Sequence, residues 1–170
     1  IPGLITPNDH VIWIDTLTPE IKEGNSRSNP GEADAVKWVI DQLCHSESFK
    51  EYQSSLKSDE DKEIGLISFY GAQMKLLNPV VESAKKQNLR IKLSSVDRFQ
   101  GMERNIIIVS LVRSNIIASH AHEKPDFKNY PEYGYKAQSK YGFAESPNRL
   151  NVALSRAKRL LIIVGNGTHF

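Results

Sequence analysis

Asn105-Ile-Ile-Ile-Val-Ser-Leu-Val112 is the most apolar run of the chain. Its β-branched residues and its short length suit a strand that is buried on both faces of a sheet. Helical and strand-like patterns alternate on either side of this run, and such alternation predicts parallel strands joined by right-handed crossovers. We therefore expect an α/β fold with a mostly parallel sheet flanked by helices, and residues 105–112 as its central strand.

The helix starts are signalled by caps, and the helices by apolar periodicity. Asn29 and Pro30 suit an N-cap and a first helical position, and apolar residues then recur at helical spacing to Leu43. Ser146 and Pro147 predict a second such start, for a helix running to about Lys158. The remaining expected elements are a buried strand at 10–15, strands at 64–70, 90–96 and 159–165, and a helix at about 71–87 that Pro79 kinks or splits.

Two segments show neither the helical nor the strand-like repeat of apolar residues. Residues 45–62 are polar and charged, and we expect a surface loop or a frayed helix there. Residues 116–145 hold several tyrosines among lysines and glycines, and we expect an inserted loop. His120 and His122 lie within it without carboxylate or cysteine support, so we expect no metal site.

Composition narrows the class of protein. The 170 residues are 39% hydrophobic and 25% charged, which indicates one globular domain rather than a disordered or fibrous chain. No apolar run is long enough to span a membrane and no leader pattern is present, so we expect no membrane partner. The chain does not begin with Met, and we expect a piece of a longer protein. The single cysteine, Cys44, excludes an internal disulfide and favours a reducing intracellular compartment, cytoplasmic or nuclear.

Charge is distributed unevenly along the chain. Residues 1–64 carry 6 basic and 13 acidic side chains, whereas residues 65–170 carry 16 basic and 7 acidic ones. The net charge of the first part is therefore −7 and that of the second part +9, although the whole chain carries only +2. A basic half of this size favours an anionic ligand such as nucleic acid or nucleotide phosphate, unless the charges merely fall unevenly.

Three segments follow expected strands, and we expect all three at the carboxyl edge of the sheet, where such folds bind ligands. They are residues 68–73, residues 95–103 and the helix at 147–158. On that helix Arg149 and Arg156 are seven residues apart, so we expect them on nearly the same side, ready for phosphate or paired with carboxylates. Gly101 permits either a tight turn or the close approach of a ligand, and Glu103 is either an acceptor for ribose hydroxyls or a plain surface residue.

The segments Ser95-Val-Asp-Arg-Phe-Gln-Gly-Met-Glu103 and Arg149-Leu-Asn-Val-Ala-Leu-Ser-Arg-Ala157 resemble motifs V and VI of superfamily 1 helicases. The most similar group is the up-frameshift-like one, which includes the RNA helicase of nonsense-mediated decay, senataxin and the immunoglobulin-mu-binding helicase. Gly65-Leu-Ile-Ser-Phe-Tyr-Gly-Ala-Gln73 resembles motif IV of that group, although members often read Thr-Pro-Tyr where Ser68-Phe-Tyr70 stands here. Some members also place a phosphate-binding arginine where Pro30 stands.

The resemblance implies that residues 1–170 form the second RecA-like domain of a helicase motor, a P-loop NTPase type of fold that lacks the P-loop itself. It implies that Arg156 is an arginine finger that reaches the γ-phosphate of ATP from across a cleft. It also implies a nucleotide edge and a face for single-stranded DNA or RNA. The residues are Gln100, Gly101, Glu103 and Arg149 for the nucleotide, and Ser68, Tyr70, Ser95 and Arg98 for the strand.

The chain contains no Gly-x-x-x-x-Gly-Lys-[Ser/Thr] segment and no Asp-Glu pair after an apolar strand. We therefore expect ATP and Mg²⁺ to be bound by the full-length protein, with the first RecA-like domain as the partner of this one. The isolated fragment is expected to bind no nucleotide tightly and to be inactive. The alternative is a non-catalytic nucleic-acid-binding or scaffold module derived from a helicase.

Overall fold

The predicted central strand is the middle strand of a five-stranded sheet. The structure is a computed structural model that describes residues 9–114 and 141–170. The strand order is β1-β7-β6-β4-β5, and every pair in this sheet is parallel, which confirms the α/β prediction. The five strands are β1 (Val11–Asp15), β4 (Ile64–Ser68), β5 (Ile91–Ser95), β6 (Arg104–Ser110) and β7 (Ala157–Gly165). A separate antiparallel hairpin consists of β2 (Ile21–Glu23) and β3 (Ser26–Ser28).

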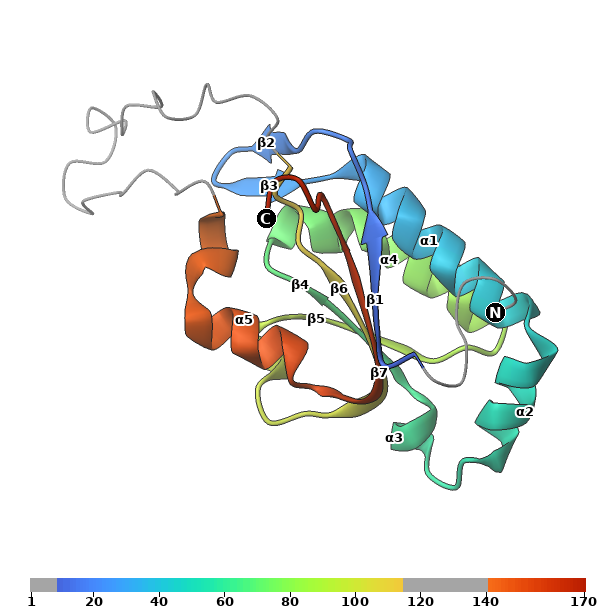
Figure 1. Ribbon diagram of the computed structural model, residues 1–170. Coiled ribbons are helices and arrows are strands. Elements are labelled where there is room, and N and C mark those ends of the chain that lie inside the picture. The colour runs from blue at the N-terminus through green and yellow to red at the C-terminus, as the bar shows by residue number, and fades with distance from the viewer. Residues whose placement is uncertain (1–8, 115–140) are drawn as a thin grey trace, which may run out of the picture.

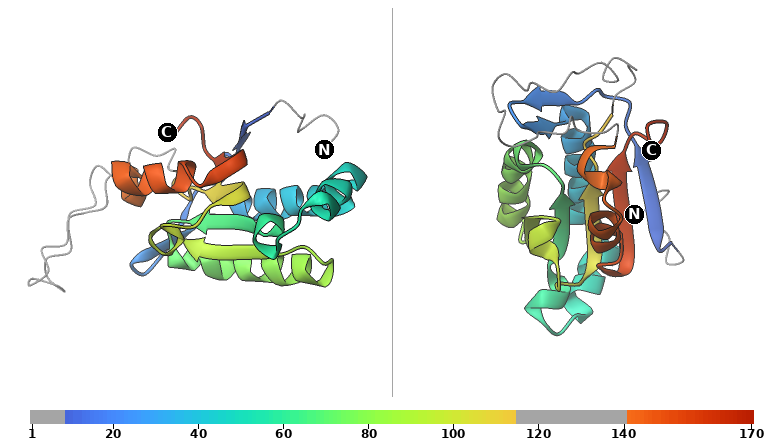
Figure 2. Two further views of the ribbon diagram at one scale, coloured as in Figure 1. Left: turned by 90° about the horizontal axis from the view of Figure 1, so that it is seen from below. Right: turned by 90° about the vertical axis from the view of Figure 1, so that its left-hand side faces the viewer.

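Helices cover both faces of the sheet (Figures 1 and 2). On one face, α1 and α4 pack on alternate residues of the strands, such as Leu66, Ile108 and Ile162. On the other face, α5 and two short 3₁₀ helices pack on the intervening residues, such as Ile107 and Ile163. The helices are α1 (Pro30–His45), α2 (Glu47–Ser55), α3 (Asp59–Lys62), α4 (Gly71–Lys86), α5 (Pro147–Leu154), η1 (Asp97–Phe99) and η3 (Gly142–Glu145).

The predicted helix starts are confirmed, and two other expectations need revision. Asn29 caps α1, because its Oδ1 accepts a hydrogen bond from the Glu32 N–H at 3.2 Å. Residues 45–62 hold two ordered helices, α2 and α3, each capped by a serine hydroxyl. The α4 helix is not split at Pro79, which is exposed on the helix surface.

The first strand and the last helix differ from their predictions. β1 was predicted to be buried, but it is an edge strand that pairs with β7 alone. Its Val11 and Trp13 side chains are therefore 62% and 42% exposed. α5 ends at Leu154 rather than near Lys158. The Arg156 carbonyl instead accepts a hydrogen bond from the Arg104 N–H at 3.1 Å, so the chain is already entering the sheet.

The predicted insertion at 116–145 falls almost wholly outside the described residues. Only its last five residues are described, and four of them form η3. Within residues 9–114 and 141–170, no helix is long and apolar enough to cross a membrane. The same residues hold no group of three or more His, Cys, Asp or Glu side chains placed to bind a metal ion.

Candidate functional site

The predicted site residues lie at two opposite edges of the sheet rather than at one. Ser68 and Ser95 end β4 and β5, so they lie at the carboxyl edge. Glu103 immediately precedes β6, and Arg156 immediately precedes β7, so both lie at the amino edge. The expectation of a single shared edge is wrong, because residues 96–103 carry the chain back along the full length of the sheet before the next parallel strand can begin.

A buried phenylalanine guides this return segment across the sheet. Phe99 of η1 is fully buried, and its ring lies against β4 at Gly65. A Cβ atom at Gly65 would stand 2.7 Å from Phe99 Cζ and 2.4 Å from Ile107 Cδ1, so only glycine lets the ring approach the strand this closely. The ring thereby fixes where the chain reaches the amino edge.

A tight turn then leads into β6. The Phe99 carbonyl accepts a hydrogen bond from the Met102 N–H at 3.1 Å, Gln100 has φ −57° and ψ 130°, and Gly101 has φ +81°. These angles are those of a type II β-turn, whose third position requires a positive φ. The tight turn predicted at Gly101 is confirmed, and Gln100 and Gly101 are both exposed at its tip.

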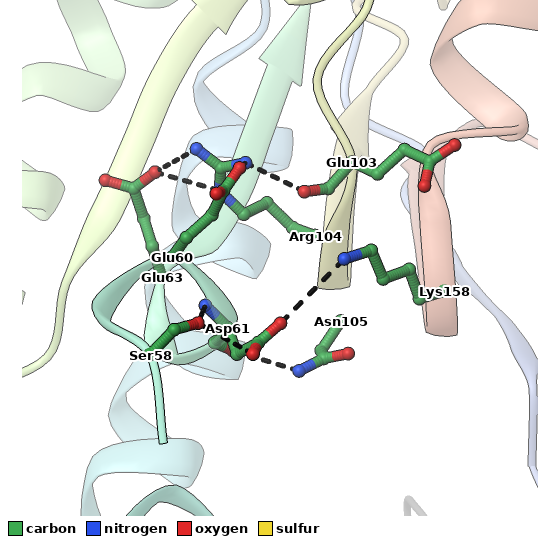
Figure 3. Close-up of polar contacts among 8 residues, drawn as sticks. All are labelled: Ser58, Glu60, Asp61, Glu63, Glu103, Arg104, Asn105 and Lys158. Atoms are coloured by element: carbon green, nitrogen blue, oxygen red, sulfur yellow. Dashed lines mark hydrogen bonds and ion pairs between the residues drawn. The ribbon is translucent and has the colours of Figure 1, made fainter. Parts of the chain in front are cut away.

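Arg104 brings Glu103 and Arg156 together at this edge. Its backbone N–H donates to the Arg156 carbonyl at 3.1 Å, and its Nη1 donates to the Glu103 carbonyl at 2.8 Å. The carboxylate of Glu103 extends away from Arg104 (Figure 3) and is exposed. The backbones of Glu103 and Arg156 therefore lie at neighbouring strand starts, both in contact with Arg104.

The guanidinium of Arg156 is not neutralised by any carboxylate within the part of the chain that the structure describes. Its Nη2 donates to the Ser155 hydroxyl at 3.0 Å, and its Nε is buried without a hydrogen-bond partner there. A guanidinium in this state retains its full charge and spare donors for a phosphate group, while the Glu103 carboxylate can accept hydrogen bonds from hydroxyls.

Arg149 is held by a carboxylate, which is one of the alternatives that the sequence left open. Its Nε and Nη2 donate to the two carboxylate oxygens of Asp97 at 2.9 and 3.0 Å, and its guanidinium carbon lies 5.0 Å from the centroid of the Phe143 ring. The pair joins α5 to η1. Because α5 ends before Arg156, the prediction that the two arginines share one helix side is wrong, and a nucleotide role for Arg149 stays a prediction.

The predicted strand contacts at the carboxyl edge differ in exposure. Ser68 is 0% and Tyr70 1% exposed. The Tyr70 hydroxyl accepts a hydrogen bond from the Phe143 N–H at 3.2 Å, and the two rings pack with centroids 5.1 Å apart, so neither Ser68 nor Tyr70 reaches the surface. Ser95 is partly exposed and Arg98 is exposed. Only these last two present side chains to a ligand in this structure.

The sequence did not predict a buried polar network that lies beneath the carboxyl edge. Glu32 is 0% exposed, and its Oε2 accepts hydrogen bonds from the Ser110 hydroxyl at 2.7 Å and from the Val112 N–H at 2.9 Å. Gln73 Nε2 donates in turn to the Ser110 hydroxyl at 3.0 Å. Burial raises the pKa of Glu32 from 4.5 to about 7, although the bond from Ser110 opposes that shift. The only sequence signal was a serine within the most apolar run.

Comparison with known proteins identifies the family of this chain. The family model described as "AAA domain" matches residues 2–168. The chain is 34% identical to "DNA polymerase alpha-associated DNA helicase A" of Saccharomyces cerevisiae across 92% of its length, and 37% identical to "Regulator of nonsense transcripts 1" of Dictyostelium discoideum across 61%. The chain belongs to the superfamily 1 helicases, in the up-frameshift-like group. The family resemblance read from the motifs is thereby confirmed.

Another similar helicase is "DNA replication ATP-dependent helicase/nuclease JHS1" of Arabidopsis thaliana, which is 25% identical across 96% of the chain. All three of these helicases are much longer proteins. The chain spans 19% of the Saccharomyces helicase, 10% of the Arabidopsis one and 6% of the Dictyostelium one.

Proposed function

We propose that this chain is the second motor domain of an ATP-dependent DNA or RNA helicase and that Arg156 is its arginine finger. The first RecA-like domain would hold ATP and Mg²⁺, and Arg156 would reach the γ-phosphate when the cleft between the domains closes. The observation that carries this proposal is that Arg156 has no carboxylate partner among the described residues, although its backbone is held at a strand start by the Arg104 N–H. Of the two motif arginines, Arg149 is occupied by Asp97, whereas the guanidinium of Arg156 keeps donors for a phosphate group.

The chemistry suits this arrangement. Phosphoryl transfer is catalysed mainly by positioning and by stabilising charge on the transferred group, and an arginine finger contributes ~10³–10⁵ in rate. Arg156 supplies that charge, and Glu103 is placed to accept hydrogen bonds from the ribose hydroxyls of the same nucleotide. The Gln100–Gly101 turn borders this position. Because the finger comes from a second domain, hydrolysis would depend on closure of the cleft.

The proposed partner at the carboxyl edge is a single strand of DNA or RNA. Ser95 and Arg98 offer a hydroxyl and a positive charge to the sugar-phosphate backbone, and such contacts carry no base information. Ser68 and Tyr70 shape that edge from beneath rather than contacting the strand, since both are buried. A translocating motor requires contacts of this sequence-independent kind.

The isolated chain should neither bind ATP tightly nor hydrolyse it, because it contains no phosphate-binding loop. The direct measurement is ATP turnover by the 170 residues with and without single-stranded nucleic acid. Turnover by this chain alone would refute the proposal that it is one half of a two-domain motor.

The arginine finger is tested in the full-length protein by Arg156→Ala. We expect strand-stimulated ATP hydrolysis to fall by ~10³-fold or more, with ATP affinity changed by less than about tenfold. Arg159→Ala is the matched control, because Arg159 is an exposed arginine three residues further along the chain, within β7. The role is wrong if the Arg156 variant keeps its turnover or if the control loses as much.

A further inference from the structure

Arg104 is an almost buried arginine that contacts both residues of the proposed nucleotide edge, Glu103 through its guanidinium and Arg156 through its backbone N–H. Its side chain is 8% exposed. Nε and Nη2 donate to Glu63 Oε1 at 2.9 and 2.7 Å, and Nη1 donates both to Glu60 Oε1 at 2.8 Å and to the Glu103 carbonyl at 2.8 Å. Figure 3 shows the guanidinium enclosed between these acceptors. One side chain therefore joins the carboxylates before β4 to the residue that precedes β6.

The helix that carries Glu60 contacts the same strand starts at further points. The Asp61 carbonyl accepts a hydrogen bond from Asn105 Nδ2 at 3.1 Å, and the Asp61 carboxylate lies 3.8 Å from Lys158 Nζ of β7. Ser58 caps this helix, and its hydroxyl also donates to Asp61 Oδ2 at 2.7 Å (Figure 3). The short helix α3 thus spans the starts of β6 and β7.

The backbone ladder between β6 and β7 is irregular at these strand starts. Arg104 pairs with Ala157, but the next pair is Ile106 with Leu160, so β7 carries one extra residue at this point. A bulge of this kind interrupts the hydrogen bonds that would otherwise extend into the sheet. Glu103 and Arg156 are therefore separated from the regular part of the sheet, and the side chain of Arg104 supports Glu103 there.

The two carboxylates contribute unequally to this support. The Glu63 side chain is 26% exposed and faces an arginine that is 8% exposed, so the loss of either partner leaves a poorly hydrated charge. The Glu60 side chain is 67% exposed, and an ion pair so open to water contributes little. Glu63 is thus the main anchor of Arg104.

We propose that Arg104, anchored by Glu63, is a positioning residue for ATP hydrolysis. It holds Glu103 and Arg156 at a fixed mutual distance, so that the ribose and the γ-phosphate of one nucleotide are engaged together. This inference rests on the proposed function of Arg156.

The test is Arg104→Met in the full-length protein, which keeps the aliphatic stem and removes the charge and the donors. We expect kcat for ATP to fall about tenfold to hundredfold, because a displacement of ~1 Å at a catalytic group has effects of that size. The KM for ATP should rise several-fold as Glu103 loses its support, and affinity for a single strand should be unchanged. Arg90→Met is the matched control, since Arg90 pairs with Asp59 of α3 at 2.6 Å but both side chains are more than half exposed.

A double variant separates positioning from stability. Arg104→Glu combined with Glu63→Arg restores an ion pair but leaves no donor for the Glu103 carbonyl. We expect the melting temperature to recover toward that of the unaltered protein while kcat stays low. If kcat and melting temperature recover together, Arg104 is merely structural and the proposal is overturned. Glu63→Gln, which retains the shape of the side chain, serves if the arginine variants do not fold, and it should lower kcat several-fold.

The outcomes distinguish this inference from the proposed function. If Arg156→Ala abolishes hydrolysis while Arg104→Met and Glu63→Gln keep full kcat per folded molecule, the positioning role alone is wrong. If Arg156→Ala itself keeps its turnover, the arginine-finger role is wrong and the positioning role falls with it.

Discussion

The buried carboxyl group of Glu32 makes the stability of this domain depend on pH in an unusual direction. Burial raises its pKa from 4.5 to about 7 in the folded chain. Each pH unit of such a shift corresponds to about 1.4 kcal/mol, so the displacement of the pKa amounts to about 3 kcal/mol of unfolding free energy. This value is a large part of the stability of an ordinary domain, which is about 5–15 kcal/mol.

The sign follows from proton release. Below pH 4.5 the Glu32 carboxyl is protonated in both the folded and the unfolded chain. As the pH rises from 4.5 to 7, the unfolded chain releases this proton while the folded chain retains it, so Glu32 increasingly favours unfolding. Above about pH 7 the loss from this group is complete.

The perturbation is Glu32→Gln, which removes the titration and keeps an oxygen for the Ser110 hydroxyl and the Val112 N–H. The assay is urea denaturation of the chain at pH 5 and at pH 8. The free energy of unfolding of the variant, minus that of the unaltered chain, should be about 2.5 kcal/mol larger at pH 8 than at pH 5, because a small part of the loss is already present at pH 5. Glu82→Gln, on the exposed side of α4, controls for the exchange of Glu for Gln as such.

The result that refutes this reasoning is a difference between variant and unaltered chain that is the same at both pH values. Ser110→Ala provides a second check. The hydrogen bond from the Ser110 hydroxyl lowers the pKa of Glu32, so its removal should raise that pKa further and extend the destabilising range to higher pH. A shift of the range toward lower pH would contradict the assignment.

Two further substitutions test the turn and a buried ion pair by urea denaturation. Gly101→Ala should lower the free energy of unfolding by about 1 kcal/mol, because Gly101 has a φ of +81°, and Gly101→Asn should lower it by less. No atom lies within 4 Å of a Cβ at this position, so the effect would come from the backbone alone. Equal stability of the unaltered chain and the two variants would refute the turn argument. Arg113→Met should cost about 1.5–3 kcal/mol, because it removes a buried charge-assisted hydrogen bond to Glu20 while Arg27 stays paired with that carboxylate. The exposed pair of Lys37 and Asp41 offers the comparison, and Lys37→Met should cost less than about 1 kcal/mol.

The sheet could be predicted because its signals are local. Residues 105–112 are apolar enough to be read as a central strand, and β6 is indeed buried at all seven of its positions. Asn29 and Pro30 predict the start of α1, because the capping hydrogen bond and the proline at the first position act within one helical turn. Burial of β1 could not be predicted, since an edge strand and an inner strand differ only in a neighbour that the local sequence does not reveal.

For the candidate site, the sequence offered residues whose roles stay predictions, and it did not indicate their geometry. The motif resemblance identified Glu103 and Arg156, yet it did not show that they lie at the amino edge of the sheet. That position depends on the return path of residues 96–103, which is set by the contact of Phe99 with Gly65 across the sheet. Long-range contacts of this kind leave no periodic pattern, and the same holds for the bond between Glu32 and Ser110.

The two edges are joined by a strand that leaves little room for internal movement. β6 begins at Arg104, beside the proposed nucleotide edge, and ends at Ser110, where Glu32 holds it beneath the carboxyl edge. Its seven residues cover about 20 Å at a rise of ~3.3 Å each, and they are paired with β4 on one side and β7 on the other. A close-packed strand transmits displacement without absorbing it. Under the proposed function, coupling between strand binding and hydrolysis should therefore involve movement of this whole domain against the first one, with the spacing between Ser110 and Arg104 unchanged.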